Sequence, residues 1–599
     1  MFITFEMSFI TWGSDLWSHF NSLSLVFMYV LGLWDGHDSG AALIRDSEIV
    51  YAANEERFTK RKLEVNFPYN SVAAALKYAD IKPTDVGHVA FTTTELTKTL
   101  ERLFPRMKES YYTFRRRKIL KPRFETFRHN LKYRMTSVGV LPMCNSISSS
   151  VIRRHLDHMG FKDYSLHVVE HHTAHAATAA FTSPFARSLV ITVDGLGDGL
   201  SGSVSTYENN RLTRHMRIGA RDSLGIFFEQ VTNIAGMREL EDEGKIMAMA
   251  DYSYPFTFEE NILKDFFSAS GTVIRARHGP VRQYGMLQRI AWKTPREQFA
   301  YFAQQLFENI ITKFVSNCMD RFGIHDVVFA GGVFSNVKAN MMIRRLDALK
   351  HWYVFPHMGD GGIALGSALF ANHMITGTSR YRFSPYLGDS YPEPDTEKAL
   401  KKERSLIVQR ETPAEQASHA AELVHSGNYV FWFQDRMEYG PRALGDRSIL
   451  APSGSEEVKE RLNLYVKKRE WFQPFAPSML EEDAEKILEY DGKGADRFMT
   501  MAYIVKEGMR HLTKSTMHID GSARPQMVGD ENPPYRDLLR NVNRHAGHGI
   551  VLNTSFNIHG MPIVASPEDA IDTMKKTNSR YMFIGGYFVE NSGARGQRA

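Results

Sequence analysis

Cysteine is scarce in this chain, whose 599 residues include only Cys144 and Cys318. Two cysteines cannot build the disulfide framework of a secreted scaffold, and their scarcity favours a reducing, cytoplasmic compartment. Long apolar runs are also missing, because charged residues interrupt the N-terminal stretch 1–27 before it reaches the roughly 18 residues of a membrane span. That stretch lacks the basic segment and cleavage site of a signal peptide. We therefore expect no membrane partner. We also expect the native chain to start at Met28, with residues 1–27 either a start-site artefact or a loose N-terminal extension.

Excess charge of one sign is small as well, at +5 from 73 basic and 68 acidic residues. Much of the basic charge falls in one segment, Arg102 to Arg134, where aromatic residues are interleaved with arginine and lysine. Such a mixture is compatible with a nucleic-acid surface. A solvated helical insertion is the simpler interpretation, since charge runs usually form solvated faces. We therefore expect an insertion here and no nucleic-acid partner.

The length predicts at least two domains, and strand and turn patterns indicate how the first is built. Residues 29–57 and 188–219 each predict a strand, an Asp-Gly turn, a second strand, a polar turn and a third strand. A strand, a glycine turn and a helix follow in 325–340 and again in 352–371. Glycines in such turns let backbone N–H groups approach a phosphate, although ordinary tight turns also use glycine. Together the four elements resemble the duplicated α/β fold of the actin, sugar-kinase and Hsp70 superfamily, in which nucleotide binds between the halves.

A segment without periodicity, residues 373–398, predicts a linker to a second α/β domain. Beyond it, helical and strand patterns alternate, and one predicted helix ends at Gly427. Basic and amide residues then recur in turn-like segments. This pattern indicates a pocket for a small, multiply charged anion, because guanidinium groups bind phosphate oxygens in pairs. Solvated surface charge is the alternative. The candidate residues are Arg436, Arg442, Arg447, Lys467, Lys468, Arg469, Arg524, Asn553 and Asn557.

Three histidines fall within the seven residues "EHHTAHA", 170–176. His171 and His175 are four residues apart, and an alanine-rich segment that favours helix follows them. On a helix both would face the same way and could bind one metal ion, as paired histidines do in zinc proteases. A helix start with solvated histidines explains these seven residues equally well.

Longer motifs cover nearly the whole chain, from about residue 31 to 590. They are "HDSGAAL", "NEERFTKRK", "EHHTAHAATAAF", "VDGLGDG", "SLGIFFEQVT", "EGKIMAMA", "FAGGVFSNVKAN", "GDGGIALGSAL", "EYGPRALGDRSILA", "QPFAPSML", "SARPQMV" and "LNTSFNIHGMPIV". By these motifs the chain resembles the NodU/CmcH carbamoyltransferase family, which includes antibiotic O-carbamoyltransferases.

The resemblance implies a two-domain enzyme. Residues 28–384 would form an actin-like domain similar to tRNA threonylcarbamoyltransferases, and residues 385–599 a YrdC-like α/β domain. The C-terminal domain would make carbamoyl-adenylate from carbamoyl phosphate and ATP. The N-terminal domain would pass the carbamoyl group to a hydroxyl of a small acceptor.

The resemblance also implies cofactors and site residues. ATP would bind with Mg²⁺, and a divalent metal, typically iron(II), would bind His171, His175 and Asp360. His37 would be the general base that removes the acceptor's hydroxyl proton, oriented by Asp38, with a simple turn histidine as the alternative. The implied nucleotide ligands are Asp194, Gly195, Gly197, Lys245, Gly331, Gly332 and Asn336. The implied carbamoyl phosphate ligands are Arg442, Arg447, Lys467, Arg524, Asn553 and Asn557. His172 and His357 would either support the metal ligands or have a structural role.

Two departures from the family pattern bear on these sites. Met561 stands where the family usually has glutamate, which alters the expected C-terminal pocket. "MAMADYS", residues 247–253, replaces the usual "MGLAPYG" and would loosen the loop after Lys245. Two other functions stay open: an RNA-modifying enzyme of the threonylcarbamoyl type, and an inactive nucleotide-binding partner protein. We also expect a homodimer.

Overall fold

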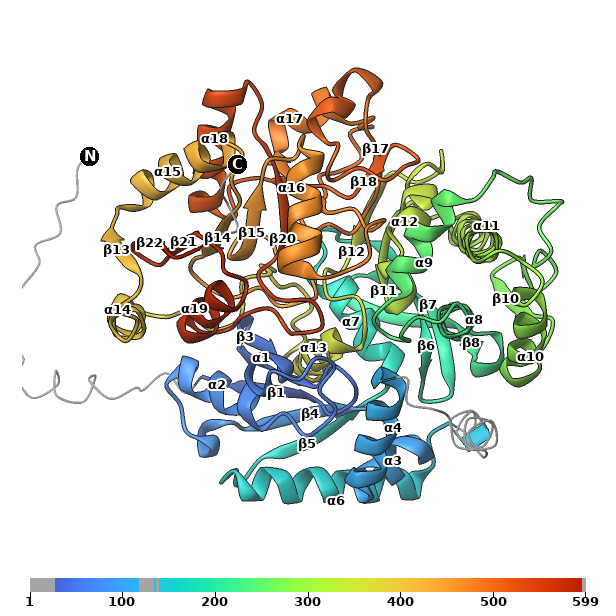
Figure 1. Cartoon of the computed structure of the whole chain (residues 1–599). Coiled ribbons are helices and arrows are strands. Elements are labelled where there is room, and N and C mark those ends of the chain that lie inside the picture. The colour runs from blue at the N-terminus through green and yellow to red at the C-terminus, as the bar shows by residue number, and fades with distance from the viewer. Residues whose placement is uncertain (1–26, 118–133, 136–138, 595–599) are drawn as a thin grey trace, which may run out of the picture.

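The computed structural model describes residues 27–117, 134–135 and 139–594, so the prediction for residues 1–27 lies almost wholly outside the described chain. The C-terminal domain, orange to red, lies above the blue-to-green N-terminal domain in Figure 1. None of the helices in the described ranges is both long and apolar enough to cross a membrane.

The first sheet of the N-terminal domain has five strands. They are β1 (Tyr29–Trp34), β2 (Gly40–Arg45), β3 (Glu48–Asn54), β4 (His88–Thr92) and β5 (Ser165–Val169). The order is β3-β2-β1-β4-β5, with the first three strands antiparallel and β4 and β5 parallel to β1. Side chains of β1 alternate between faces, so Val30 joins one hydrophobic core while Leu31 and Leu33 join another. The outer core is covered by α2 (Tyr69–Ala79) and α6 (Pro142–His158) (Figure 1).

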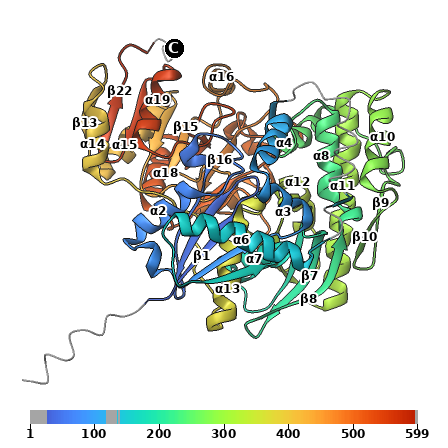
Figure 2. The same ribbon diagram turned by 90° about the horizontal axis from the view of Figure 1, so that it is seen from below.

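The second sheet repeats this arrangement. Its strands are β6 (Ser188–Gly197), β7 (Leu200–Glu208), β8 (Arg211–Gly219), β11 (Asp326–Ala330) and β12 (His351–Val354). From one edge to the other the order is β8-β7-β6-β11-β12. It matches β3-β2-β1-β4-β5 of the first sheet, because three antiparallel strands are again followed by two parallel ones. Figure 2 shows the outer side of this half, which is formed by α8 (Leu224–Ile234), α10 (Pro280–Ala291), α11 (Arg296–Phe322), β9 (Phe267–Ser270) and β10 (Val273–Ala276). The predicted duplication of an α/β domain is confirmed.

Two helices lie between the sheets. α7 (His171–Thr182) follows β5 and packs on β6 and β11 of the other sheet, whereas α13 (Ile363–Thr376) follows β12 and packs on β1, β2 and β4. Small residues allow the close contact, because a Cβ atom on Gly366 would lie 2.1 Å from the Ala174 carbonyl oxygen. The last helix of each half of the N-terminal domain thus packs on the sheet of the other half. This arrangement brings the start of α7 and the start of α13 together.

The C-terminal domain is built on one eight-stranded sheet. In spatial order its strands are β13 (Ile407–Arg410), β22 (Tyr587–Glu590), β21 (Tyr581–Ile584), β14 (Val430–Phe433), β15 (Arg447–Ala451), β20 (Ile550–Ser555), β16 (Ala476–Leu480) and β19 (Gln526–Val528). Its helices are α14 (Glu393–Lys401), α15 (Pro413–His425), α16 (Glu456–Arg461), α17 (Glu481–Ile487), α18 (Pro533–Ala546) and α19 (Pro567–Lys576). A second α/β domain is therefore confirmed, and Gly427 follows α15 with φ +84°, as a helix-ending glycine should.

The predicted linker is shorter than expected. α13 continues to Thr376 and α14 begins at Glu393, so only residues 377–392 lack a helix or strand within the predicted range 373–398. Pro394 lies in the first turn of α14, where a helix tolerates proline, so the start of this helix resembled a linker in sequence.

The basic segment is only partly solvated. Within the described part of the chain it enters α3 (Leu96–Leu103) and α4 (Pro105–Arg117). Arg102 and Lys108 are 5% and 4% exposed. Arg102 pairs with the Asp35 carboxylate, and Lys108 donates to the Asp35 backbone carbonyl. The nearby Lys98 also pairs with the Asp35 carboxylate, at 3.2 Å. The Arg102 guanidinium donates to both Asp35 carboxylate oxygens at 2.8 Å. The expectation of a solvated face is therefore wrong at these positions, since each cation has a buried acceptor.

Replacing Asp35 with asparagine should destabilise the fold by about 3 kcal/mol at pH 7, because it leaves buried cations without their counter-charge. Burial raises the pKa of Asp35, but Arg102, Lys98 and Lys108 outweigh it and hold the pKa well below the ordinary value. The stabilisation that the Asp35 carboxylate gives the fold is therefore present above the pKa of about 3.9 that Asp35 has in the unfolded chain. It is lost as the pH falls through the lower pKa of Asp35 in the folded protein. Urea unfolding tests this, with the exposed Asp157→Asn variant as control. Equal stability of wild type and Asp35→Asn at pH 7 would contradict the account.

Candidate functional site

Four potential metal ligands meet where the two halves of the N-terminal domain join. His171 and His175 lie one turn apart on α7, Asp194 lies in β6, and Asp360 lies in the turn before α13. One donor atom from each lies within 4.8 Å of all the others. The Nε2 atoms of His171 and His175 are 3.3 and 3.4 Å from Asp194 Oδ2, and 3.5 and 3.4 Å from Asp360 Oδ1.

The surroundings of these side chains fit a bound cation. The Nδ1 atom of His171 is 3.0 Å from the Thr93 hydroxyl, which leaves Nε2 facing the cluster. The Nε2 atom of His175 and the Oδ1 atom of Asp360 are buried without a hydrogen-bond partner in the described chain. Two imidazoles and two carboxylates suit zinc, iron or manganese. Buried donors of this kind are stabilised by an ion that all four share.

Asp194 is the potential metal ligand that the sequence assigned to nucleotide binding. Its Oδ1 atom accepts the Gly332 N–H at 2.9 Å, so Oδ2 is left to face the histidines. No residue spacing in the sequence marks a carboxylate at the end of a strand as a metal ligand. The packing of α7 on β6 brings Asp194 to the two histidines.

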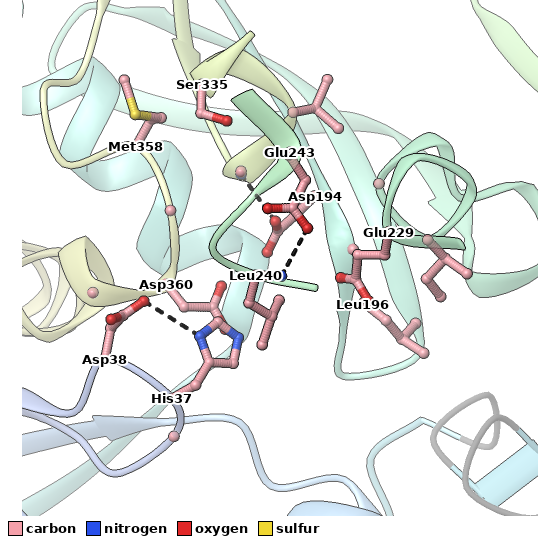
Figure 3. Close-up of a pocket in the computed structure, with 18 of the residues that line it drawn as sticks. His37, Asp38, Asp194, Leu196, Glu229, Leu240, Glu243, Ser335, Met358 and Asp360 are labelled. Atoms are coloured by element: carbon pink, nitrogen blue, oxygen red, sulfur yellow. Dashed lines mark hydrogen bonds and ion pairs between the residues drawn. The ribbon is translucent and has the colours of Figure 1, made fainter. Parts of the chain in front are cut away.

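His37 lies beside the cluster (Figure 3). Its Nε2 atom is 3.1 Å from Asp360 Oδ2, and its Nδ1 atom is 3.5 Å from Asp38 Oδ2. Burial lowers the pKa of His37, but the charges of Asp360 and Asp38 outweigh burial and raise that pKa to about 10. Without a cation on Asp360, His37 is therefore itself a cation, which differs from the near-neutral base that the motif predicts.

A cavity of about 320 Å³ opens from His37 and the metal cluster. Three predicted nucleotide residues, Gly195, Gly332 and Asn336, line it together with Asp194. Sequence reasoning missed several of its polar lining residues. They are Glu95, Thr97, Lys98, Glu101, Tyr112, Glu229 and Glu243. Burial and the neighbouring Glu229 charge raise the pKa of Glu243 to about 8, so its carboxyl group is protonated at neutral pH.

The other three predicted nucleotide residues do not line this cavity. A Cβ atom on Gly331, which has φ +101°, would lie 2.1 Å from the Val193 carbonyl oxygen. A Cβ atom on Gly197 would lie 2.2 Å from the His171 ring. These glycines therefore serve close packing around the metal ligands. Lys245, on α9 (Glu243–Met249), pairs with Asp242 at 3.0 Å and with Glu470 of the C-terminal domain at 2.8 Å.

His172 and His357 have the structural roles that the sequence suggested. His172 Nδ1 is 3.0 Å from the Thr192 hydroxyl, and His357 Nε2 is 2.8 Å from Asn54 Oδ1. Burial, together with the positive neighbour His171, lowers the pKa of His172 to about 3. Burial likewise lowers the pKa of His357 to about 4. Both rings are therefore neutral, and each has a hydrogen-bond partner outside the group of four potential metal ligands.

A second cluster, of four cations, lies in the C-terminal domain. Arg442 and Arg524 are half-buried and make no hydrogen bond or ion pair with the described residues. Burial lowers the pKa of Arg442 to about 10, and burial with repulsion from Arg442 and Arg469 keeps the pKa of Arg524 well below its ordinary value. Burial and the charge of Arg469 also lower the pKa of Lys467. Cations that repel one another in this way would be stabilised by a bound anion, so the cluster is a candidate anion site.

Lys467 is held at the end of a π-helical turn, Leu462–Lys467. Its ammonium donates to the Ser555 carbonyl and to Asn557 Oδ1, the latter at 2.7 Å. Arg469 stacks over Phe475 with its guanidinium carbon 4.0 Å from the ring centroid. The sequence placed Arg469 among its candidates without committing to it, and the structure adds it to the cluster.

Arg447 does not belong to this cluster, so its prediction as an anion ligand is wrong. Its guanidinium donates to backbone carbonyls of Gln434, Asp435, Asp446 and Asp389 and is fully buried. The residue holds its loop in place and has no free face for phosphate.

The two predicted asparagines are also engaged. Asn553 is buried and donates to the Ser478 hydroxyl at 3.0 Å and to the Ala443 carbonyl at 3.2 Å. Asn557 accepts from Lys467 and donates to the Met561 carbonyl at 2.6 Å. The backbone of Met561, and not its unusual side chain, therefore supports the lysine.

The second departure from the motif also has a structural role. Asp251 in "MAMADYS" is ion-paired with Lys338 of α12 (Val337–Arg344), which also pairs with Asp520 of the C-terminal domain at 2.6 Å. His518 Nδ1 lies 3.3 Å from Asp251. The loop after Lys245 is thus tied to the C-terminal domain, contrary to the loosening that the sequence suggested.

Comparison with known proteins matches both halves of the chain to one family. Residues 29–369 match the carbamoyltransferase N-terminus and residues 421–591 the carbamoyltransferase C-terminus. An uncharacterized protein of Methanocaldococcus jannaschii is 35% identical, over 74% of this chain and 77% of its own. Nodulation protein NolNO of Sinorhizobium fredii is 30% identical, over 96% of this chain and 81% of its own. The 3'-hydroxymethylcephem-O-carbamoyltransferase of Amycolatopsis lactamdurans is 28% identical, over 64% of this chain and 73% of its own. The chain is an enzyme that belongs to the carbamoyltransferase family, as its motifs predicted.

Proposed function

We propose that the protein is an ATP-dependent O-carbamoyltransferase with two reaction sites. The C-terminal cation cluster forms carbamoyl-adenylate from carbamoyl phosphate and ATP, and the cavity of the N-terminal domain transfers the carbamoyl group to a hydroxyl of a small acceptor. The observation that carries the proposal is the cluster of Arg442, Lys467, Arg469 and Arg524, which lacks an acidic partner within hydrogen-bonding or ion-pair distance among the described residues.

In the first step water cleaves carbamoyl phosphate to carbamate and phosphate. A carbamate oxygen then attacks the α-phosphorus of ATP, and pyrophosphate leaves. The guanidinium groups of Arg442 and Arg524 hold phosphate oxygens in pairs, and Lys467 adds a point charge. Four cations around one dianion stabilise the charge that develops on the departing phosphate.

In the second step the acceptor hydroxyl attacks the carbamoyl carbon, and AMP leaves. When bound to the cluster of His171, His175, Asp194 and Asp360, a divalent metal would polarise the carbamoyl oxygen and share the negative charge of Asp360. His37 takes the hydroxyl proton at Nε2, for which it must be neutral. The protonated Glu243, at the start of α9 in the cavity lining, can donate a hydrogen bond to a substrate oxygen.

The test is pyrophosphate release from MgATP with carbamoyl phosphate present or absent. The proposal predicts release of at least one pyrophosphate per protein only with carbamoyl phosphate, and recovery of [¹⁴C]carbamoyl label bound to AMP. Release that needs bicarbonate and threonine instead would identify threonylcarbamoyl chemistry. Binding of ATP without any release would show a nucleotide-binding partner protein.

A further inference from the structure

One loop of the C-terminal domain, residues 438–446, touches both reaction sites. Arg442 belongs to the cation cluster, while the adjacent Pro441 lines the cavity of the N-terminal domain. The loop is internally braced, because Glu438 Oε1 accepts the N–H groups of Leu444, Asp446 and Arg447 at 2.8 to 3.1 Å. We call residues 438–446 the bridging loop.

Tyr439 is the point where the bridging loop reaches the metal cluster. It is 2% exposed, and its hydroxyl donates to the Gly361 carbonyl at 2.7 Å. Gly361 directly follows Asp360. The Tyr439 ring also packs edge-on against His357, with 4.8 Å between centroids. A side chain of the C-terminal domain thus holds the turn that carries a metal ligand.

The Gly361 carbonyl also accepts a hydrogen bond from within the N-terminal domain. Asn54 Nδ2 donates to the Asp38 carbonyl at 2.8 Å and to the Gly361 carbonyl at 3.4 Å. The two donors on Gly361 therefore fix the turn of Asp360 relative to the turn of His37 and Asp38. Of these two bonds the one from Tyr439 is the shorter, so it is the stronger restraint.

We propose that Tyr439 is a positioning residue of the metal site, so that the domain that makes carbamoyl-adenylate also holds Asp360 in place for metal binding. The inference rests on the metal site of the proposed function and is independent of the acceptor. Groups that orient metal ligands typically change metal affinity by about 10- to 100-fold when they are removed.

The direct test is the Tyr439→Phe variant, which keeps the ring against His357 and removes only the hydroxyl. Mn²⁺ is titrated into metal-free protein while free Mn²⁺ is followed by electron paramagnetic resonance. The proposal predicts at least about 10-fold weaker binding than in wild type. The control is Tyr207→Phe, because Tyr207 is fully buried and donates to the Ser379 carbonyl at 3.0 Å, away from both sites. Its Mn²⁺ affinity should stay within twofold of wild type.

A second variant tests whether a contact that holds the bridging loop also affects metal binding. Arg57 of the N-terminal domain donates to the Gly440 carbonyl at 2.7 Å, so Arg57→Lys should also weaken Mn²⁺ binding by loosening the bridging loop. Unchanged affinity in Tyr439→Phe, an equal loss in Tyr207→Phe, or no Mn²⁺ binding by wild type would each overturn the proposal. Pyrophosphate release is measured alongside. If wild type releases none, the adenylate-forming role fails, while the Mn²⁺ titration still decides the role of Tyr439.

Discussion

Replacing Arg442 with alanine should lower carbamoyl-phosphate-dependent pyrophosphate release by about 100-fold. The reason is that Arg442 has no partner within the described structure, so its guanidinium is available to phosphate oxygens. Arg524 lies close enough to be repelled by it, and Arg524→Ala should cause a loss of similar size. Each substitution relieves that repulsion, so both variants should fold at least as stably as wild type. Release is measured with a coupled pyrophosphate assay, and stability by thermal unfolding.

Arg540→Ala is the matched control for these variants. Arg540 lies on α18 of the same domain and is half exposed. Among the described residues its one ion-pair partner is Asp537, three residues away. Its removal should leave pyrophosphate release unchanged. If Arg442→Ala releases pyrophosphate at the wild-type rate, the anion site lies elsewhere in the C-terminal domain.

Replacing His175 with alanine should weaken divalent metal binding by more than about 100-fold, a larger effect than removal of a supporting group. The Nε2 atom of His175 is buried, makes no hydrogen bond in the described chain and lies 3.4 Å from one carboxylate oxygen each of Asp194 and Asp360, as expected of ligands that share a cation. Mn²⁺ titration of metal-free protein checks the loss.

His172→Asn is the control on the same helix. The His172 ring faces Thr192 and not the cluster, and asparagine can keep the bond from that position. Mn²⁺ affinity should stay within threefold of wild type. Equal losses in His175→Ala and His172→Asn would mean that α7 is merely destabilised.

The metal site shows what a sequence can and cannot predict. Spacing places His171 and His175 on one face of a helix, and the structure has them there, in α7. Asp360 was found only by family resemblance. Asp194 was assigned to nucleotide, because no local pattern shows that β6 ends opposite α7. Contacts between elements far apart in the chain follow from the crossing of α7 and α13, which periodicity does not encode.

Two predictions for basic residues, those for Arg447 and Arg102, failed for a related reason. Arg442 and Arg447 are five residues apart in similar turns. Arg442 makes no hydrogen bond or ion pair with the described residues, whereas Arg447 is surrounded by four backbone carbonyls. Sequence gives the charge of a side chain and not the direction of nearby carbonyl groups. The same holds for Arg102, which looked solvated within a basic run but is paired with Asp35.

The central claim is that carbamoyl-adenylate forms in the C-terminal domain and that the metal cluster of the N-terminal domain acts only in transfer. Pyrophosphate release from MgATP and carbamoyl phosphate in the His175→Ala variant tests this claim most directly. The account predicts a burst within about threefold of wild type even though Mn²⁺ binding is lost, because the cations that act on carbamoyl phosphate lie in the other domain. Loss of pyrophosphate release together with metal binding would contradict it, since both steps would then depend on the cluster of His171, His175, Asp194 and Asp360.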